Sequence, residues 1–122
     1  MAESTRQGGF SSAPYTSLNL GLYTKDEAAV IQQNRDHFFS QLDCKESSVA
    51  GMHQVHGAEV LRVDEAGQYA GYDAIITNVA GLFLTVTVAD CTPVLIYDPL
   101  HKAVAAIHAG WRGTVAGIAS KT

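Results

Sequence analysis

The first clear periodicity in the chain is helical. Apolar residues recur at helical spacing at four positions: Ala28, Ile31, Phe38 and Leu42. The pattern therefore predicts a helix over residues 25–41. Thr24 and Glu27 have the spacing of a capping box, in which each side chain satisfies a free backbone amide at a helix start. The preceding residues 8–23 are rich in Gly, Ser, Pro and Asn, so we expect a loop there with a short extended piece around residues 17–20.

After this helix the pattern changes to short apolar runs separated by turns. Six runs are candidate strands: residues 48–53, 59–63, 74–77, 83–88, 94–97 and 104–108. Several are apolar at consecutive positions, which is typical of strands covered on both faces. The last run leads through Gly110 and Gly113 into a terminal helix. Strands with helices at both ends predict an α/β fold of layered mixed sheets flanked by helices, with the strand order left open.

Length and composition narrow the class of protein. The chain has 122 residues, of which 47% are hydrophobic and 16% charged, which predicts one globular domain over residues 1–122. A formal net charge of -4 with scattered Lys and Arg argues against nucleic-acid or anionic-membrane partners. No apolar run is long enough to span a bilayer. With no signal-peptide pattern near Met1, reduced cysteines and a cytoplasmic location are expected.

Three short segments combine metal-binding residue types with the ends of predicted strands. They contain His56 beside Gly57, Cys91 before Pro93, and His108 before Gly110. Two imidazoles and one thiolate suit zinc, and three protein ligands with a fourth position open are typical of a catalytic ion. Their spacing alone is a weak signal, because a single cysteine beside a strand is more often a small core residue.

The same segments carry a family resemblance. Gln54-Val-His-Gly57, Ala89-Asp-Cys-Thr-Pro-Val-Leu95 and His108-Ala-Gly-Trp-Arg-Gly-Thr114 resemble motifs of the YfiH family, long labelled polyphenol oxidase or multicopper laccase. The upstream stretches around Gly8-Gly9, Ser17-Leu-Asn-Leu-Gly21 and Asn34-Arg35 are similar to that family too. The likeness covers nearly the whole chain. Because the family's domain is longer, and because the chain ends within a helix pattern, this chain is expected to be an incomplete, N-terminal portion of it.

The resemblance implies a function and a ligand set. It implies a YfiH-like α/β fold, related to the α/β/β/α layers of cysteine hydrolases. It also implies a zinc-dependent purine nucleoside phosphorylase that acts on adenosine, inosine and methylthioadenosine and deaminates adenosine. The implied metal ligands are His56, Cys91 and His108, with copper a possible alternative to zinc. The partners would be purine nucleosides and phosphate, in a monomer or weak homodimer.

The laccase label can be tested by counting ligands. A multicopper centre needs several copper ions with more than one imidazole each, and the chain has five histidines, of which His37 and His101 lie in polar stretches. A copper-dependent polyphenol oxidase therefore remains an alternative that the composition disfavours.

Other residues near these motifs are candidates for catalysis. A zinc ion could activate water for attack on adenine, with Asp90 carrying protons or only supporting Cys91. Arg112, at the start of the terminal helix, could grip phosphate or form a salt bridge that fixes the turn. Trp111 could stack on a purine or simply pack.

The remaining candidates are weaker. His53 is expected outside the ligand set and Cys44 to be a surface thiol. Arg6 could reach substrate, and Asn19 could equally stabilise a turn.

Two further functions stay open. Cys91 could be a thiolate nucleophile with His108 as base, in a cysteine hydrolase or transferase. Alternatively, the chain could be a metal-bearing or nucleoside-binding module without enzyme activity.

Overall fold

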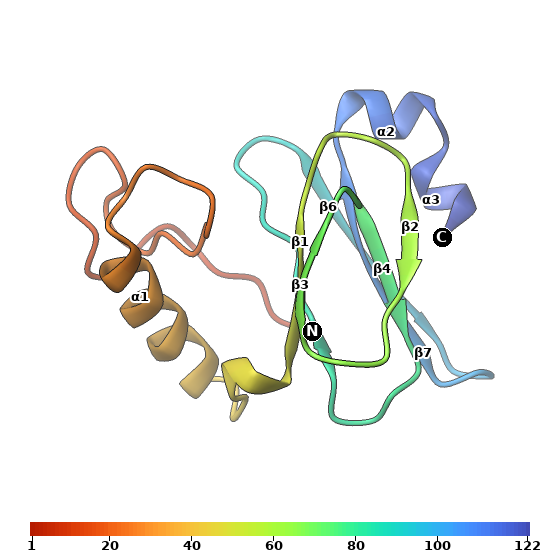
Figure 1. Cartoon of the computed structure of the whole chain (residues 1–122), viewed down its shortest axis with the longest axis horizontal. Helices are drawn as coiled ribbons and strands as arrows, with labels where there is room; N and C mark the ends of the chain where they lie inside the picture. The colour runs from red at the N-terminus through yellow and green to blue at the C-terminus, as the bar shows by residue number, and fades with distance from the viewer. The chain divides into compact units, whose positions relative to one another are not determined.

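The computed structural model describes all residues, 1–122, as two compact units, Met1–Glu46 and Ser47–Thr122 (Figure 1). The first unit consists of a long loop and one helix. The second contains two sheets and two short helices, and all three sequence motifs with metal-ligand residue types. No helix of the chain has the length and apolar character needed to cross a membrane.

The predicted helix is present in the first unit as α1, Ala28–Ser40, but it begins later than residue 25. The predicted capping box is wrong. Glu27 occupies the N-cap position without a side-chain cap hydrogen bond. The Thr24 hydroxyl instead donates to the Gly21 carbonyl oxygen and accepts from the Asn19 amide. Because the Thr24 side chain makes these hydrogen bonds within the loop, it does not cap the helix, which begins later, at Ala28.

The buried face of α1 has helical spacing, but half of its buried residues are polar. Its buried residues are Ile31, Asn34, Arg35 and Phe39. The Asn34 side chain accepts from the Phe10 amide and donates to the Ser11 hydroxyl, so it holds the loop against the helix. Loop residues 17–20, expected to be extended, form no strand.

Two predictions of side-chain burial in the first unit are wrong. Leu42 is exposed, because the helix ends before it. Cys44, expected at the surface, is only 7% exposed, and burial raises the pKa of its thiol. Its amide donates to the carbonyl oxygen of Phe39, which folds the chain back and covers the thiol.

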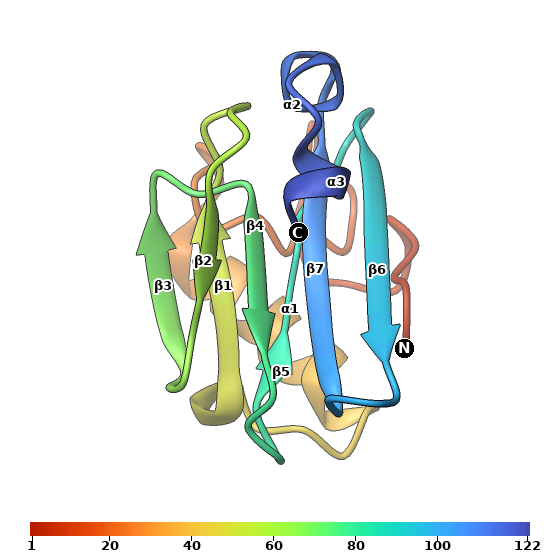
Figure 2. The same cartoon turned by 90° about the vertical axis from the view of Figure 1, so that its right-hand side faces the viewer.

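The short 3-10 helix η1, Glu46–Ser48, spans the boundary between the units, and the second unit contains two sheets (Figure 2). The first sheet is parallel, in the order β3 (Gly67–Ala70), β1 (Val49–His53), β5 (Phe83–Leu84). The second is mixed, in the order β2 (Val60–Arg62), β4 (Ala74–Thr77), β7 (Ala103–Ala109), β6 (Thr92–Asp98). Strand β7 runs antiparallel to both neighbours. The expected fold class, mixed sheets with helices, is confirmed.

Alternating side chains of the second sheet build a core on each of its faces. Ile75 and Ala106 are cross-strand partners and pack with Ala50 of β1, in the layer between the two sheets. Their neighbours Ala74 and Ile107 point the other way. They pack under Ile118 of the terminal helix α3 (Ile118–Lys121). The order of layers in this unit is therefore sheet, sheet, helix (Figures 1 and 2).

The remaining differences from the predicted strands have local causes. Strand β3 was not predicted, because Gly67–Ala70 contains little apolar sequence. Strand β5 is shorter than residues 83–88. Strand β6 is longer than residues 94–97 and lies at a sheet edge with Tyr97 59% exposed, so it is not covered on both faces. The terminal helix is broken at Gly117, whose φ of 75° separates α2 (Trp111–Val115) from α3.

Candidate metal centre

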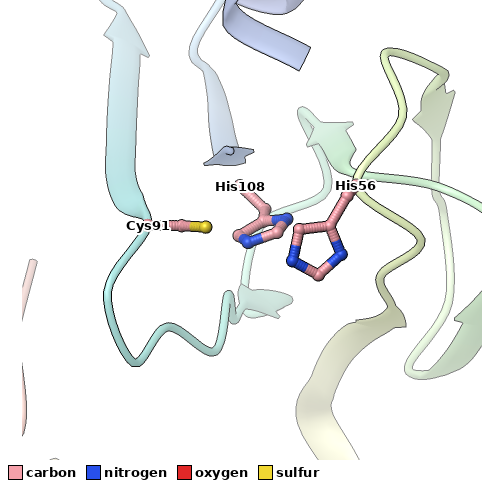
Figure 3. A group of neighbouring side chains, drawn as sticks. All are labelled: His56, Cys91 and His108. Atoms are coloured by element: carbon pink, nitrogen blue, oxygen red, sulfur yellow. The ribbon is translucent and has the colours of Figure 1, made fainter. Parts of the chain in front are cut away.

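His56, Cys91 and His108 converge in the second unit (Figure 3). One ligand atom from each residue lies within 4.8 Å of the others, and no other group of three or more His, Cys, Asp and Glu residues in the chain does so. The two imidazole rings are nearly perpendicular, with centroids 4.8 Å apart. Three segments far apart in sequence therefore bring two nitrogen donors and one sulfur donor together.

Strand register explains why Cys91 and His108 share a face. His108 is the partner of Pro93 across the β6–β7 ladder, and Cys91 lies two residues before Pro93. Cys91 lies directly before β6, which begins at Thr92, and the strand alternation carried back by one residue puts its side chain on the same face as that of Pro93. Cys91 is thus a diagonal neighbour of His108, at the end of the sheet where β6 begins and β7 finishes (Figure 3).

His56 comes from the loop that follows β1, and its backbone has an unusual conformation. Its φ is 60°, in the left-handed region that costs a residue with a side chain about 1–2 kcal/mol. The amides of three successive residues in this loop donate to one carboxylate. They are Val55, His56 and Gly57, at 3.1, 3.0 and 2.8 Å from the side-chain oxygens of Asp73. These hydrogen bonds stabilise the turn.

Asp73 lies immediately before β4 and is fully buried. Besides the loop amides it contacts the His108 ring, with 2.7 Å between Asp73 Oδ1 and His108 Nδ1. Burial opposes its ionisation, but the hydrogen bonds from His108 and the loop amides outweigh burial and lower the pKa of the carboxyl. Because an ionised carboxylate only accepts hydrogen bonds, Nδ1 must carry the proton. In the neutral imidazole, Nε2 of His108 then has a lone pair for a ligand.

Gly110 provides the space in which the three side chains meet. A Cβ atom at this position would lie 3.3 Å from the His56 ring, 3.4 Å from Cys91 Sγ and 3.7 Å from the His108 ring. Gly110 is the N-cap of α2, with φ and ψ of -69° and 166° that any residue can adopt. The glycine therefore matters here for volume and not for backbone freedom.

The charge around the cluster is negative. Burial, the Asp90 carboxylate beside the thiol, and Asp73 raise the pKa of Cys91. These surroundings disfavour a free thiolate, because reactive thiolates need positive neighbours. The donor set of two imidazoles and one thiol near two carboxylates fits a divalent cation such as zinc.

The other predicted residues lie outside this cluster. Arg112 is exposed, forms no ion pair, and lies over the Trp111 ring at 5.3 Å, so the salt bridge that was the alternative to phosphate binding is absent. Trp111 is 73% exposed and does not pack in a core. His53, at the end of β1, is exposed and is not one of the three converging residues, as expected.

Two weaker candidates lie in the first unit. The Asn19 side chain accepts from the Gly21 amide at 3.1 Å, so it stabilises a turn. Arg6 is exposed, and its carbonyl oxygen accepts from the amides of Ser17 and Leu18.

Sequence reasoning missed Asp73 and the spatial role of Gly110. One signal could have revealed Asp73: a carboxylate directly before the buried run Ala74–Thr77 needs buried partners. Its partner could not be identified without knowing that β4 pairs with β7.

The two-sheet α/β fold and the His–Cys–His cluster define an α/β protein with a candidate metal site. Comparison with known proteins gives its family. The whole chain, residues 1–122, matches the family described as multi-copper polyphenol oxidoreductase laccase. The chain belongs to this family, which includes the YfiH proteins.

Individual relatives agree with this assignment. Purine nucleoside phosphorylase ORF3 of Streptomyces griseus is 43% identical over 119 residues, which are 94% of this chain and 48% of that protein. The crystal structure of YlmD from Geobacillus stearothermophilus superposes with a TM-score of 0.94 at 34% identity, over 97% of this chain and 47% of YlmD. YfiH of Bacillus licheniformis gives a TM-score of 0.88 at 31% identity, over 95% of this chain and 47% of YfiH. The chain spans about half the length of the relatives it matches.

Proposed function

We propose that this chain carries the zinc site of a purine nucleoside phosphorylase. The observation that supports this most is the convergence of His56, Cys91 and His108, whose ligand atoms lie within 4.8 Å of one another. The Streptomyces griseus relative bears the same enzyme name. Since the chain spans about half of such relatives, the activity is proposed for the whole protein.

Zinc is preferred to copper because of the donor set. Two imidazole nitrogens and one thiolate, with a fourth position open, are typical of catalytic zinc, although copper also accepts these donors. A multicopper oxidase would need many more imidazoles than this cluster offers, and the other three histidines, His37, His53 and His101, are exposed and not part of it. When bound, zinc would supply a Lewis acid that activates water for the deamination of adenosine.

For phosphorolysis, we assign anion binding to Arg112. A phosphate oxygen attacks C1′ of the ribose, the bond from C1′ to the purine nitrogen breaks, and the departing purine takes up the proton that the hydrogen phosphate loses. Arg112 lies two residues after Gly110, which abuts the cluster, and its guanidinium has no ion-pair partner. An unpaired guanidinium can donate two hydrogen bonds to phosphate. Adenosine, inosine and methylthioadenosine share the purine joined to C1′ of a furanose ring that this reaction requires.

For deamination, we assign proton transfer to Asp90. Deamination adds water to C6 of adenine and releases ammonia, so a proton must move from the water to the leaving nitrogen. Asp90 is exposed, and its side chain hydrogen-bonds Cys91 and raises the pKa of that thiol. Of the two carboxylates beside the cluster, Asp73 accepts from loop amides and Asp90 does not.

The cysteine-nucleophile alternative is less well supported. A nucleophilic cysteine needs a lowered pKa, whereas burial and Asp90 raise the pKa of Cys91. A binding module without enzyme activity would keep the same cluster, so only turnover separates it from an enzyme.

Metal analysis and a turnover assay on the whole protein test the proposal. We expect about one zinc per chain, lost in Cys91→Ser and retained in the control Cys44→Ser. We also expect inosine and phosphate to give hypoxanthine and ribose 1-phosphate. Bound zinc should protect Cys91 from alkylation. A metal-free protein that turns over and is inactivated by alkylation of Cys91 would support the cysteine enzyme. Nucleoside binding without turnover would support the binding module.

A further inference from the structure

Asp73 hydrogen-bonds both the His108 ring and the loop that carries His56. We infer that Asp73 is a positioning residue that prepares two of the three ligands at once, by fixing the tautomer of His108 and the conformation of the His56 loop. This inference rests on the proposed metal site. Asp73 lies outside the three motifs that carry the ligands.

The first step concerns His108. Its ring is only 4% exposed, and Asp73 Oδ1 lies 2.7 Å from its Nδ1. A carboxylate at this position stabilises the tautomer with the proton on Nδ1 and leaves the Nε2 lone pair available. In metal sites, a carboxylate behind a histidine ligand fixes the ring orientation in the same way.

The second step concerns His56. Its positive φ of 60° is unfavourable for a residue with a side chain. Three consecutive amides, of Val55, His56 and Gly57, donate to Asp73 and hold the loop in this conformation. Without the carboxylate, these amides would lack their acceptor, and the His56 ring would lose its fixed direction.

The third step excludes Asp73 itself as a ligand. Oδ1 accepts from the His56 amide and from the His108 ring, while Oδ2 accepts from the Val55 and Gly57 amides. Each carboxylate oxygen has two lone pairs, so these four hydrogen bonds use all of them. Asp73 therefore acts on the metal only through His56 and His108.

The substitution Asp73→Asn tests this role with almost no change of shape. With its amide nitrogen at the Oδ2 position, Asn would face two backbone donors, from Val55 and Gly57. With the nitrogen at the Oδ1 position, it would face one backbone donor and would donate to Nδ1 of His108. The second orientation loses fewer hydrogen bonds, and it moves the imidazole proton to Nε2, the atom needed for the metal. Asp98→Asn is a matched control, because Asp98 Oδ2 lies 2.6 Å from Nδ1 of His101 at the far end of β7.

Two readouts are taken on the whole protein. In the metal-free form, ¹H–¹⁵N correlation spectra of the imidazoles report which nitrogen of His108 carries the proton. Competition with a chelator of known affinity reports zinc binding. We expect Nδ1–H in the wild type and Asp98→Asn, and Nε2–H in Asp73→Asn. The zinc affinity of Asp73→Asn should be lower by about 10- to 100-fold, the usual effect of removing such a partner.

The outcomes separate this inference from the proposed metal site. A wild-type His108 with its proton on Nε2 would overturn the inference, whether or not Asp73→Asn folds. So would an Asp73→Asn protein with wild-type tautomer and zinc affinity. If the wild type binds no zinc while His108 carries Nδ1–H, the metal site fails, and the tautomer control by Asp73 stands.

Discussion

Asp73 and His108 are directly opposite each other across two antiparallel strands. Ala74 is the partner of Ile107 in the β4–β7 ladder, and one step further the His108 amide donates to the Asp73 carbonyl oxygen at 2.7 Å. Opposed residues of an antiparallel pair point to the same face. The backbone pairing and the side-chain pairing therefore reinforce each other, and the ligand His108 is fixed by the sheet itself.

This relationship predicts a large loss of stability for Asp73→Ala. The substitution leaves three loop amides and the His108 ring without their acceptor in a fully buried position. Each buried donor left without its acceptor costs about 1–3 kcal/mol, so the loss of all four hydrogen bonds should cost several kcal/mol. Denaturant unfolding should show this difference. Asp98→Ala removes a partly exposed carboxylate that accepts from the His101 ring and two backbone amides, so it should cost less, about 0.5–1.5 kcal/mol, and a loss no larger than this for Asp73→Ala would contradict the buried network.

Much of the fold could be predicted from local sequence. The run Ala74–Thr77 forms β4 with the predicted bounds, because its consecutive apolar residues are covered on both faces. Strand β3 could not be predicted, because hydrogen bonds to β1 stabilise it and its own sequence has no apolar strand pattern. The exposed β6 was misjudged for a related reason: an edge strand and a central strand can have the same apolar sequence, and only the strand order distinguishes them.

The candidate site was predictable in its ligands and not in their support. His56, Cys91 and His108 stand in motifs that resemble those of the YfiH family, and the resemblance predicted their convergence, which their spacing alone signals only weakly. Asp73 and Gly110 act through geometry, by register in one case and by missing volume in the other. Such roles depend on which strands are neighbours, and that information is not local in the sequence.

Gly110→Ala should weaken metal binding while the protein remains folded. The new Cβ would lie 3.3 Å from the His56 ring and 3.4 Å from Cys91 Sγ, closer than most real Cβ contacts, so the ligands must move apart. The backbone at Gly110 already has dihedral angles that alanine adopts. Zinc affinity, measured by chelator competition, should therefore fall while the melting temperature changes little.

Gly57→Ala is the control for that substitution. Its Cβ would make ordinary contacts, at 3.5 Å from an Asp73 oxygen and 3.6 Å from the Val55 side chain. It adds the same methyl group one residue from His56 and keeps the amide that donates to Asp73. Equal zinc affinities in the two variants would show that volume at Gly110 is unimportant.

Asp98 and His101 predict a local pH dependence. A side-chain hydrogen bond from His101 holds the pKa of Asp98 below its ordinary value of 3.8. Because the folded pKa is below the unfolded one, the pair contributes stability above the unfolded pKa, and this contribution is lost as the pH falls through the folded pKa. His101→Ala should raise the Asp98 pKa toward 3.8, as followed by NMR titration of the carboxyl carbon. An unchanged titration curve would mean that His101 does not pair with Asp98 in solution.

Arg112→Ala should separate phosphate binding from metal binding. The side chain is exposed and lacks an ion pair, so its loss should change the unfolding free energy by no more than about 0.5 kcal/mol and leave the zinc content intact. A lost charge-assisted contact of about 2–3 kcal/mol should raise the KM for phosphate by roughly 30- to 150-fold. Steady-state kinetics of inosine phosphorolysis at varied phosphate measure this.

The deamination reaction supplies the internal control for Arg112. Adenosine deamination consumes water and no phosphate, so Arg112→Ala should reduce it much less than phosphorolysis. Arg62→Ala, which removes another exposed guanidinium at 3.4 Å from an exposed Asp64 carboxylate, should leave both reactions unchanged. Equal losses of both reactions in Arg112→Ala would instead mean that Arg112 acts through Trp111 and the α2 turn that follows Gly110. Its role would then be to shape the cluster, because a change of turn geometry would disturb both reactions alike.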